Sequence, residues 1–382
     1  MLDTAIVGGG LSGLALARRM QKHGRDCALF EARDRIGGRI LTVPVDGRAL
    51  DLGPAWYWPH TQPRMTRLIA ELGLTHFAQH DQGTVLSLND PDKAPQPYPV
   101  DGVHGGARRL EGGMASLAQV LAAGFPADAL HLNHMLIAVI EQGDHVELHF
   151  RCGDSIRQIS ARRVVLAVPP RLLEEHVRFE PPLAEPLIRS MRSTYTWMAD
   201  QAKVAVTYPL SFWRAAGLAG NAFVGHEQAV LYETFDACNA AGDRAALGGF
   251  IALSPAVRAS YQTGLPLLIT NQLVQLFGRE AENGTQYRHD WATEIYTSST
   301  LDQSPPRVHP PYDDPLLRRP WWTSRLYFCG SETAAYAAGY MEGALEASER
   351  VEFMLTAEGP EAAGRGSMSG ASYPDAIPGA IL

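Results

Sequence analysis

The chain has 382 residues, which is enough for two domains of roughly 150–200 residues each or for one large enzyme with an inserted lobe. Apolar residues make up 46% and charged residues 19%, a composition that excludes a disordered or fibrous protein. Lys and Arg number 33 against 41 Asp and Glu, so the formal net charge is −8. A mildly acidic chain with no basic block lacks the electrostatic signature of a nucleic-acid-binding protein, and we expect no nucleic-acid partner.

The four cysteines are far apart in the sequence and form no CxxC pair (Cys27, Cys152, Cys238 and Cys329). That spacing fits neither a zinc site nor a disulfide framework and is typical of a reducing compartment. No apolar run approaches the roughly 18 residues of a membrane helix, and the N-terminus lacks the pattern of a signal peptide. We therefore expect a cytoplasmic protein without membrane contact, with a flexible, Gly- and Ala-rich tail over residues 357–382.

The first strong motif begins directly after a short apolar strand. Gly8, Gly10 and Gly13 form a GxGxxG turn that leads into a helical pattern, and a second strand at residues 27–30 ends on Glu31. In such a turn the first glycine permits the bend, the second lets the backbone approach a pyrophosphate, and the third lets helix and strand pack closely. Glu31 stands 18 residues after Gly13, where an acid can bind ribose hydroxyls, so the segment predicts a dinucleotide-binding βαβ unit.

A second glycine-rich turn follows the second strand. Gly37 and Gly38 precede Arg39 at a point where a nicotinamide-dependent dehydrogenase usually continues into another helix. We interpret this turn and its arginine as contacts for the far end of a longer cofactor.

The remaining elements are predicted from their hydrophobic periodicity. Residues 81–107 are rich in Pro, Gly and Asp and predict irregular structure. Helices are expected at residues 63–73, from about 114, at 267–277 and at about 343–355, and strands at 136–141, 146–150, 164–168 and 325–329, with an antiparallel pattern over 198–250.

Five blocks of residues, in this order, resemble the flavin-dependent amine oxidases, the family of the monoamine and polyamine oxidases. The last of them is highly specific, because it must place a helix N-terminus beneath the cofactor. The first block is the GxGxxG turn, and the other four are Glu31-Ala32-Arg33 with Gly37-Gly38-Arg39, Gly112-Gly113-Met114, Lys203 followed by Phe212-Trp213, and Gly330-Ser331-Glu332-Thr333-Ala334 with Gly339-Tyr340-Met341-Glu342-Gly343-Ala344.

The resemblance implies an α/β protein whose Rossmann-type FAD-binding domain, built on the GxGxxG βαβ unit, is combined with a discontinuous α+β substrate domain. It places the FAD-binding domain at residues 1–75, 108–192 and 294–356, and the substrate domain at residues 76–107 and 193–293. The first insertion is about thirty residues long, shorter than in larger relatives, which leaves open how enclosed the active site is.

The same resemblance implies contacts with non-covalently bound FAD. Glu31 would bind the adenosine ribose, Leu136 would contact the adenine through its backbone, and Glu332 would reach the ribityl or phosphate region. The backbone of Met341 would point at the flavin pyrimidine, and Thr300 stands where some relatives attach the flavin to a cysteine. The complete set of expected cofactor contacts is Gly8, Gly10, Ser12, Gly13, Glu31, Ala32, Arg33, Gly38, Arg39, Gly53, Ala55, Trp56, Leu136, Trp291, Gly330, Glu332, Tyr340, Met341 and Ala344.

Lys203 and Tyr340 are the predicted catalytic residues. Lys203 stands in an apolar strand, where an unpaired lysine is rarely buried, and its context resembles the family lysine that holds a water near flavin N5. The alternative for Lys203 is an exposed position on the polar face of an edge strand. Tyr340 matches one wall of an aromatic cage that guides the neutral amine, whereas Leu301 stands where the opposite aromatic belongs, so we expect a half-built cage.

The expected function is the FAD-dependent oxidation of a small amine to an imine, with the electrons passed to O₂, giving hydrogen peroxide, or to another acceptor. Two alternatives stay open: a related FAD-dependent dehydrogenase or desaturase of a non-amine substrate, and a flavin-binding protein without turnover. No metal site is predicted, because no further ligand pattern completes the HxxH pair of His131 and His134. The sequence does not identify the amine.

Overall fold

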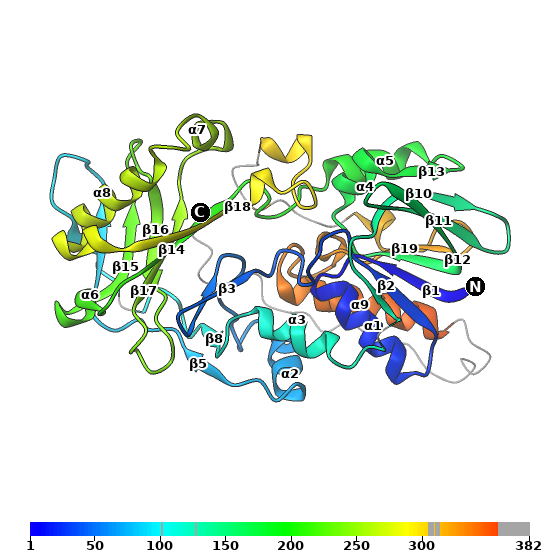
Figure 1. Ribbon diagram of the computed structural model, residues 1–382, viewed down its shortest axis with the longest axis horizontal. Helices are drawn as coiled ribbons and strands as arrows, with labels where there is room; N and C mark the ends of the chain where they lie inside the picture. Colours follow the sequence, from blue (N-terminus) through cyan, green and yellow to red (C-terminus); the bar gives the residue numbers. More distant parts are fainter. Residues whose placement is uncertain (101, 127, 305–308, 310–313, 358–382) are drawn as a thin grey trace.

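The computed structural model describes residues 1–357 except 101, 127, 305–308 and 310–313, so the predicted tail lies outside the described residues apart from its first residue. Two large sheets lie toward opposite ends of the long axis, with smaller elements between them (Figure 1). No helix in the described ranges is long and apolar enough to span a membrane.

The centre of the first sheet is parallel. β1 (Leu2–Val7) lies between β2 (Cys27–Phe30) and β12 (Ser155–Leu166), while β9 (Leu130–His131) pairs with β2 and β19 (Leu326–Phe328) with the end of β12. The last four residues of β1 and all of β2 are buried, as expected for parallel strands that are covered on both faces.

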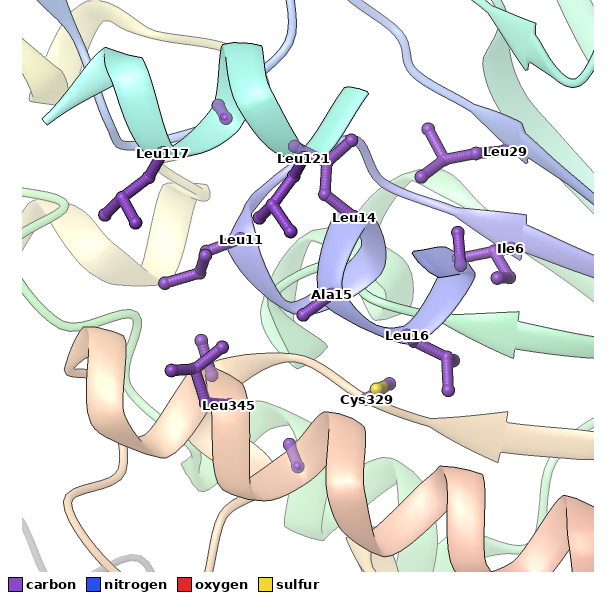
Figure 2. Packing of buried hydrophobic residues seen from close by; sticks show 14 of the residues in the cluster. Ile6, Leu11, Leu14, Ala15, Leu16, Leu29, Leu117, Leu121, Cys329 and Leu345 are labelled. Carbon is purple, nitrogen blue, oxygen red and sulfur yellow. The ribbon is translucent and has the colours of Figure 1, made fainter. Parts of the chain in front are cut away.

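The helix α1 (Leu11–Lys22) follows β1 and is packed between two other helices. Figure 2 shows its leucines facing Leu117 and Leu121 of α3 (Ala115–Ala122) on one side and Leu345 of α9 (Met341–Ala357) on the other. Because helices cover it from both sides, α1 has a buried surface wider than a single amphipathic stripe. This packing fixes the N-termini of α1 and α9.

The outer part of the first sheet is antiparallel. The first half of β12 pairs with β11 (Val146–Cys152), which pairs with β10 (Met135–Glu141), and β13 (Arg178–Glu180) forms the edge. Two short helices, α4 (Pro170–His176) and α5 (Glu185–Ser193), follow β12 and flank β13 in the sequence.

The second sheet has the order β18-β14-β17-β16-β15-β6-β7 in the described part of the chain. The helix α8 (Leu265–Phe277) covers one of its faces, where it packs with Val204 and Val206 of β14. The strands are β6 (Thr84–Leu88), β7 (Gln96–Pro97), β14 (Ala202–Thr207), β15 (Leu218–Val224), β16 (Leu231–Asp236), β17 (Ala246–Ile251) and β18 (Thr285–Asp290), with the short helices α6 (Phe212–Ala215) and α7 (Pro255–Ser260) in the connections.

The prediction of irregular structure throughout residues 81–107 is wrong. β6 adds to the second sheet parallel to β15, and β7 pairs with β6 at the edge. The apolar residues Val85, Leu86 and Leu88 are buried there, so tertiary packing outweighs the Pro- and Gly-rich flanks.

The remaining elements join the two sheets. They are the pairs β3 (Thr42–Val45) with β4 (Arg48–Asp51) and β5 (His76–Ala78) with β8 (Arg108–Leu110), the helix α2 (Pro63–Glu71), and the 3₁₀ helices η1 (Arg279–Asn283), η2 (Trp291–Thr293), η3 (Thr300–Gln303), η4 (Pro315–Leu317) and η5 (Ser331–Thr333). The strands of the first sheet fall within the segments predicted for FAD binding, and those of the second within the predicted substrate segments. The exact domain boundaries stay a prediction.

Candidate functional site

A cavity of about 370 Å³ lies between the two large sheets. Its walls come from the first sheet and α1 at one end and from β14, β16 and β17 of the second sheet at the other. Of the predicted site residues, Gly13 and Glu332 do not line this cavity. Those that do are Gly8, Gly10, Ser12, Glu31, Ala32, Arg33, Gly38, Arg39, Gly53, Ala55, Trp56, Leu136, Lys203, Trp291, Gly330, Tyr340, Met341 and Ala344.

The turn between β1 and α1 depends on glycine. Gly8 has a φ of +108°, and a Cβ there would lie 2.5 Å from the carbonyl oxygen of Ala167. A Cβ on Gly13 would overlap the carbonyl oxygen of Gly8, so Gly13 packs the helix against the strand instead of facing the cavity. Gly10 has open space beside it, where the nearest atom to a Cβ is the Cα of Gly38 at 3.9 Å. The start of α1 therefore presents unpaired backbone N–H groups to the cavity.

Glu31 lies at the end of β2 and is 4% exposed. One carboxylate oxygen accepts the N–H of Gly9 at 2.6 Å, and the other accepts the N–H of Arg33 at 2.9 Å. Because each carboxylate oxygen accepts about two hydrogen bonds, Glu31 retains acceptor capacity toward the cavity. Leu136 of β10 lines the same end of the cavity.

The two predicted arginines are both held by acidic partners. The guanidinium of Arg33 pairs with Glu294 at 2.9 Å and donates to the hydroxyl of Thr297 at 2.8 Å. Arg39 pairs with Glu332 at 2.5 Å and also donates to the Trp197 carbonyl at 3.0 Å. Glu332 is paired with Arg39 and does not line the cavity, so its predicted contact with the ribityl or phosphate region of FAD stays a prediction.

A third group of site residues surrounds the N-terminus of α9. Gly330 follows β19, where a Cβ would lie 2.9 Å from the carbonyl oxygen of Val168. The Ser12 hydroxyl donates to the Cys329 carbonyl and so ties α1 to this turn. α9 begins at Met341, and its first residues line the cavity. The positive end of the helix dipole therefore faces the cavity and favours negative charge there.

The Gly112-Gly113-Met114 block has a packing role next to the cavity. Asp51 accepts the backbone N–H of Met114 at 2.9 Å, and a Cβ on Gly113 would lie 2.8 Å from the same carboxylate oxygen. Burial raises the pKa of Asp51, and the positive charge of Arg109 lowers that pKa by a smaller amount. These contacts fix the segment that continues from Asp51 to Gly53 at the cavity wall.

Lys203 is buried in β14, next to the edge strand of the second sheet. β14 pairs with β17 on one side and β18 on the other, so the alternative of an exposed edge-strand lysine is wrong. The Lys203 ammonium donates to the carbonyl of Gly53 at 2.8 Å and lies 4.8 Å from the centre of the Phe250 ring and 5.7 Å from that of Trp56. Burial lowers its pKa from 10.5 to about 8, against a smaller opposing effect of the Asp51 carboxylate.

Tyr340 has aromatic neighbours that sequence reasoning missed. Its ring stacks on His309 at 5.2 Å between centres and lies 5.9 Å from the ring of Trp197. Leu301, expected in place of the second cage aromatic, is 48% exposed and does not line the cavity. Trp197 and His309 therefore surround Tyr340, and the missing aromatic at position 301 no longer argues by itself against turnover. No sequence pattern connects these three residues, because packing alone brings them together.

Thr300, which stands where some relatives attach the flavin to a cysteine, contacts Glu175. The Thr300 hydroxyl donates to the Glu175 carboxylate at 2.8 Å on the exposed side of η3. None of the four cysteines of the chain lines the cavity that the structure describes.

Sequence reasoning also missed a polar group in the second sheet. Glu233 of β16 and His104 both line the cavity, and the Nε2 of His104 lies 3.8 Å from the Glu233 carboxylate. A β-bulge between Leu231 and Glu233 turns both Tyr232 and Glu233 toward the cavity, which a strict alternation of the strand does not predict.

The arrangement fits FAD on structural grounds. Two helix N-termini, those of α1 and α9, face one cavity, and Gly10 leaves open space beside the first of them. Glu31 stands at one end with spare acceptor capacity, and Lys203 stands at the other end among aromatic rings. Phosphates bind at helix N-termini, and ribose hydroxyls donate to carboxylates, so this donor set matches a dinucleotide.

Comparison with known proteins agrees with this geometry. The family model of the flavin-containing amine oxidoreductases matches residues 11–94 and 87–351. The flavin-containing amine oxidase B of Sus scrofa is 26% identical over 91% of this chain and 85% of that protein, and that of Homo sapiens is 25% identical over the same shares.

Solved structures show the same fold. Putrescine oxidase bound to putrescine superposes with a TM-score of 0.77 at 22% identity, covering 94% of this chain and 99% of that one. Cyclohexylamine oxidase from Brevibacterium oxydans has a TM-score of 0.77 at 19% identity, with the same coverage. The predicted α/β fold with a Rossmann-type FAD-binding domain is confirmed. The chain belongs to the flavin-containing amine oxidoreductase family and is an FAD-dependent enzyme of that family.

Proposed function

We propose that this enzyme oxidises the C–N bond of a small amine to an imine, and that O₂ takes the electrons to give hydrogen peroxide. The single observation that carries the proposal is Lys203, a buried ammonium among aromatic rings in the cavity that also holds the GxGxxG turn. Bound FAD supplies the acceptor for the hydride equivalents of the C–H bond next to the amine nitrogen. Water then hydrolyses the released imine.

The proposed cofactor contacts follow from the residues at each part of the cavity. The backbone at the start of α1 would hold the pyrophosphate, Glu31 the adenosine ribose, and the N-terminus of α9 the pyrimidine side of the ring. Trp291 is held by a hydrogen bond of its Nε1 to the Leu52 carbonyl at 3.0 Å and would pack beside the ring. With no cysteine in the cavity, we propose non-covalent FAD.

Lys203 and Tyr340 would position the reactants. The Gly53 carbonyl takes one N–H of the Lys203 ammonium, which leaves donors for a water molecule in the cavity. With a pKa of about 8, Lys203 can exchange a proton with that water near neutral pH. The Tyr340 ring, held against His309 and Trp197, would form a wall that orients the amine.

The test is anaerobic mixing of the purified FAD-loaded enzyme with a panel of primary and secondary amines, followed at the oxidised flavin absorbance band. We expect at least one amine to bleach the flavin, and admission of air to restore the band with one peroxide formed per flavin. Bleaching without peroxide formation in air would contradict the proposal of O₂ as acceptor. An intact flavin band with every amine would contradict amine oxidation itself.

A further inference from the structure

One histidine in the cavity wall has no part in the chemistry proposed so far. His104 lines the cavity, and its side chain is 5% exposed. Its Nε2 is buried and has no hydrogen-bond partner among the described residues. A buried nitrogen without a partner costs free energy, so a polar group of a ligand is favoured beside this atom.

The other side of the His104 ring is fixed by Asp81. The Nδ1 of His104 lies 2.6 Å from one oxygen of the Asp81 carboxylate, and the backbone N–H of His104 donates to the other oxygen at 3.0 Å. The amide of Asn221 donates to the same carboxylate at 3.0 Å. Burial raises the pKa of Asp81, but these hydrogen bonds together outweigh burial and hold the pKa below its ordinary value. An ionised carboxylate only accepts hydrogen bonds, so in neutral His104 the proton is on Nδ1 and the lone pair is on Nε2.

His104 lies one aromatic ring away from the catalytic lysine. Its ring centre is 4.7 Å from that of Trp56, and the Trp56 ring in turn lies 5.7 Å from the Lys203 ammonium. The charged groups that pair with His104 are Asp81, from the connection between β5 and β6, and Glu233 of β16, whose carboxylate is 3.8 Å from Nε2. Both carboxylates would stabilise a positive charge on the ring, and the Lys203 ammonium opposes them from beyond Trp56.

Amine oxidation needs a proton acceptor at this end of the cavity. An alkylammonium has a pKa close to that of lysine, about 10.4, so only about one molecule in 10³–10⁴ is neutral at pH 7. The neutral amine alone has the nitrogen lone pair that stabilises the cation formed when hydride leaves the neighbouring carbon. Lys203 does not fit this role, because with a pKa of about 8 it is mostly protonated at pH 7.

The cavity itself makes loss of the substrate proton easier. Burial lowers the pKa of the Lys203 ammonium from 10.5 to about 8, and a substrate ammonium among the same aromatic rings is subject to the same desolvation. The two carboxylates beside His104 favour the ring as the new location of the positive charge. Proton transfer from the substrate to His104 is therefore much closer to balance here than in water.

We propose that His104 is a catalytic base that takes the proton of the incoming ammonium, and that Asp81 positions it. One N–H bond of the ammonium breaks and leaves its electron pair on nitrogen, while the proton forms a bond with Nε2. The products are the neutral amine and an imidazolium between Asp81 and Glu233, so the net charge of the site is unchanged. The imidazolium returns the proton to water before the next turnover. This inference rests on the proposed amine oxidation and adds a residue to it.

The first test is anaerobic stopped-flow reduction of the FAD-loaded enzyme by butylamine and by benzylamine between pH 7 and 10. The quantity measured is the second-order rate constant at amine concentrations far below saturation. His104→Gln should lower it by about 10²–10⁴-fold at pH 7, the range of general acid–base contributions. The rate constant of this variant should then rise about tenfold per pH unit as neutral amine accumulates in solution, and approach that of wild type at pH 10.

Asp81→Asn tests the positioning role. The asparagine amide can donate to Nδ1, which moves the ring proton to Nε2 and removes the lone pair, so this variant should show the same loss at pH 7 and the same recovery at pH 10. His145→Gln is the matched control. The Nδ1 of His145 also lies 2.6 Å from an aspartate, Asp144, but that pair is in the exposed turn between β10 and β11 and does not line the cavity. This control should keep wild-type rate constants at every pH.

Two kinetic results would overturn the proposal. One is a His104→Gln variant that reduces its flavin at the wild-type rate at pH 7. The other is a loss of rate that stays the same at pH 10, because damage to packing is not repaired by a supply of neutral amine.

A second test does not depend on turnover. tert-Butylamine has no C–H bond next to its nitrogen and is not oxidised, but its ammonium can still give a proton to His104. In enzyme labelled with ¹⁵N-histidine, the Nε2 resonance that is missing from His104→Gln should be that of a bare nitrogen at pH 8 and should move toward the protonated value when tert-butylamine is added. An Nε2 that carries the proton before addition, or that does not respond, would contradict the base role. If no amine bleaches the flavin, the oxidation proposal fails, and this measurement still decides whether His104 takes a proton from an amine.

Discussion

Replacing Lys203 with methionine should impair the proposed chemistry while leaving the stability of the fold nearly unchanged at pH 7. The side chain is 3% exposed, and burial lowers its pKa from 10.5 to about 8. At about 1.36 kcal/mol per pKa unit, the charged form of Lys203 therefore destabilises the fold by roughly 3 kcal/mol at neutral pH. Methionine removes that cost and also removes the charged hydrogen bond to Gly53, which contributes about 1.5–3 kcal/mol. The two effects nearly cancel, so Lys203→Met should fold at pH 7 with a stability within about 2 kcal/mol of wild type.

The pH dependence of the free energy of unfolding distinguishes wild type from Lys203→Met more clearly than a measurement at pH 7 alone. Below pH 8 both the folded and the unfolded wild-type chain carry the Lys203 proton, so this residue adds no pH dependence. Between pH 8 and 10.5 the folded chain has lost the proton and the unfolded chain still binds it, so unfolding takes up a proton and becomes less favourable as the pH rises. Wild type should therefore gain roughly 3 kcal/mol relative to Lys203→Met across that range.

The measurement is urea unfolding of both FAD-loaded proteins between pH 7 and 10, together with stopped-flow flavin reduction and reoxidation at pH 7. Lys93→Met is the control, since that lysine is 75% exposed. We expect Lys203→Met to retain FAD and to slow reduction or reoxidation by about 10²–10⁴-fold, the range of general acid–base contributions. A stability difference that does not change with pH would refute the burial of a titrating amine, and wild-type rates of both half-reactions would refute its place beside the flavin.

Three further predictions concern the cofactor and the aromatic wall. Glu31→Ala should weaken FAD binding by about 1.5–3 kcal/mol, because hydrogen bonds to a charged acceptor are lost, and full flavin occupancy after dialysis would contradict the ribose assignment. Acid precipitation should release all flavin into the supernatant, because Thr300 replaces the attachment cysteine, so yellow colour in the pellet would exclude non-covalent binding. Tyr340→Ala should raise the dissociation constant of bulky amines more than that of methylamine with little change in the flavin spectrum, and equal effects on both would exclude Tyr340 from the amine's path.

The parts of the site that follow local patterns were predictable from the sequence. The GxGxxG turn, the acid at Glu31 and the helix after β19 depend on residues close together in the chain, and the physical demands on each are specific. The apolar strand around Lys203 was predictable as well. That it lies inside a sheet was not, because its outer neighbour β18 begins far downstream at Thr285.

The features that sequence reasoning missed depend on packing between distant segments. His309 and Trp197 meet Tyr340 from two other parts of the chain, and no periodicity relates them. Glu233 faces the cavity because of a bulge, and a bulge leaves no hydrophobic signature. The ion pair of Glu332 with Arg39 was also missed, because the two residues lie almost three hundred positions apart in the chain.

Three backbone carbonyls accept hydrogen bonds from side chains that line the site. The Gly53 carbonyl accepts from Lys203, the neighbouring Leu52 carbonyl accepts from Trp291, and the Trp197 carbonyl accepts from Arg39. A Cβ at Gly53 would overlap the Arg39 carbonyl, so only glycine lets the segment that carries the Leu52 and Gly53 carbonyls pack this closely. The lysine is thus positioned by the same short segment, residues 52–56, that continues along the wall of the cavity.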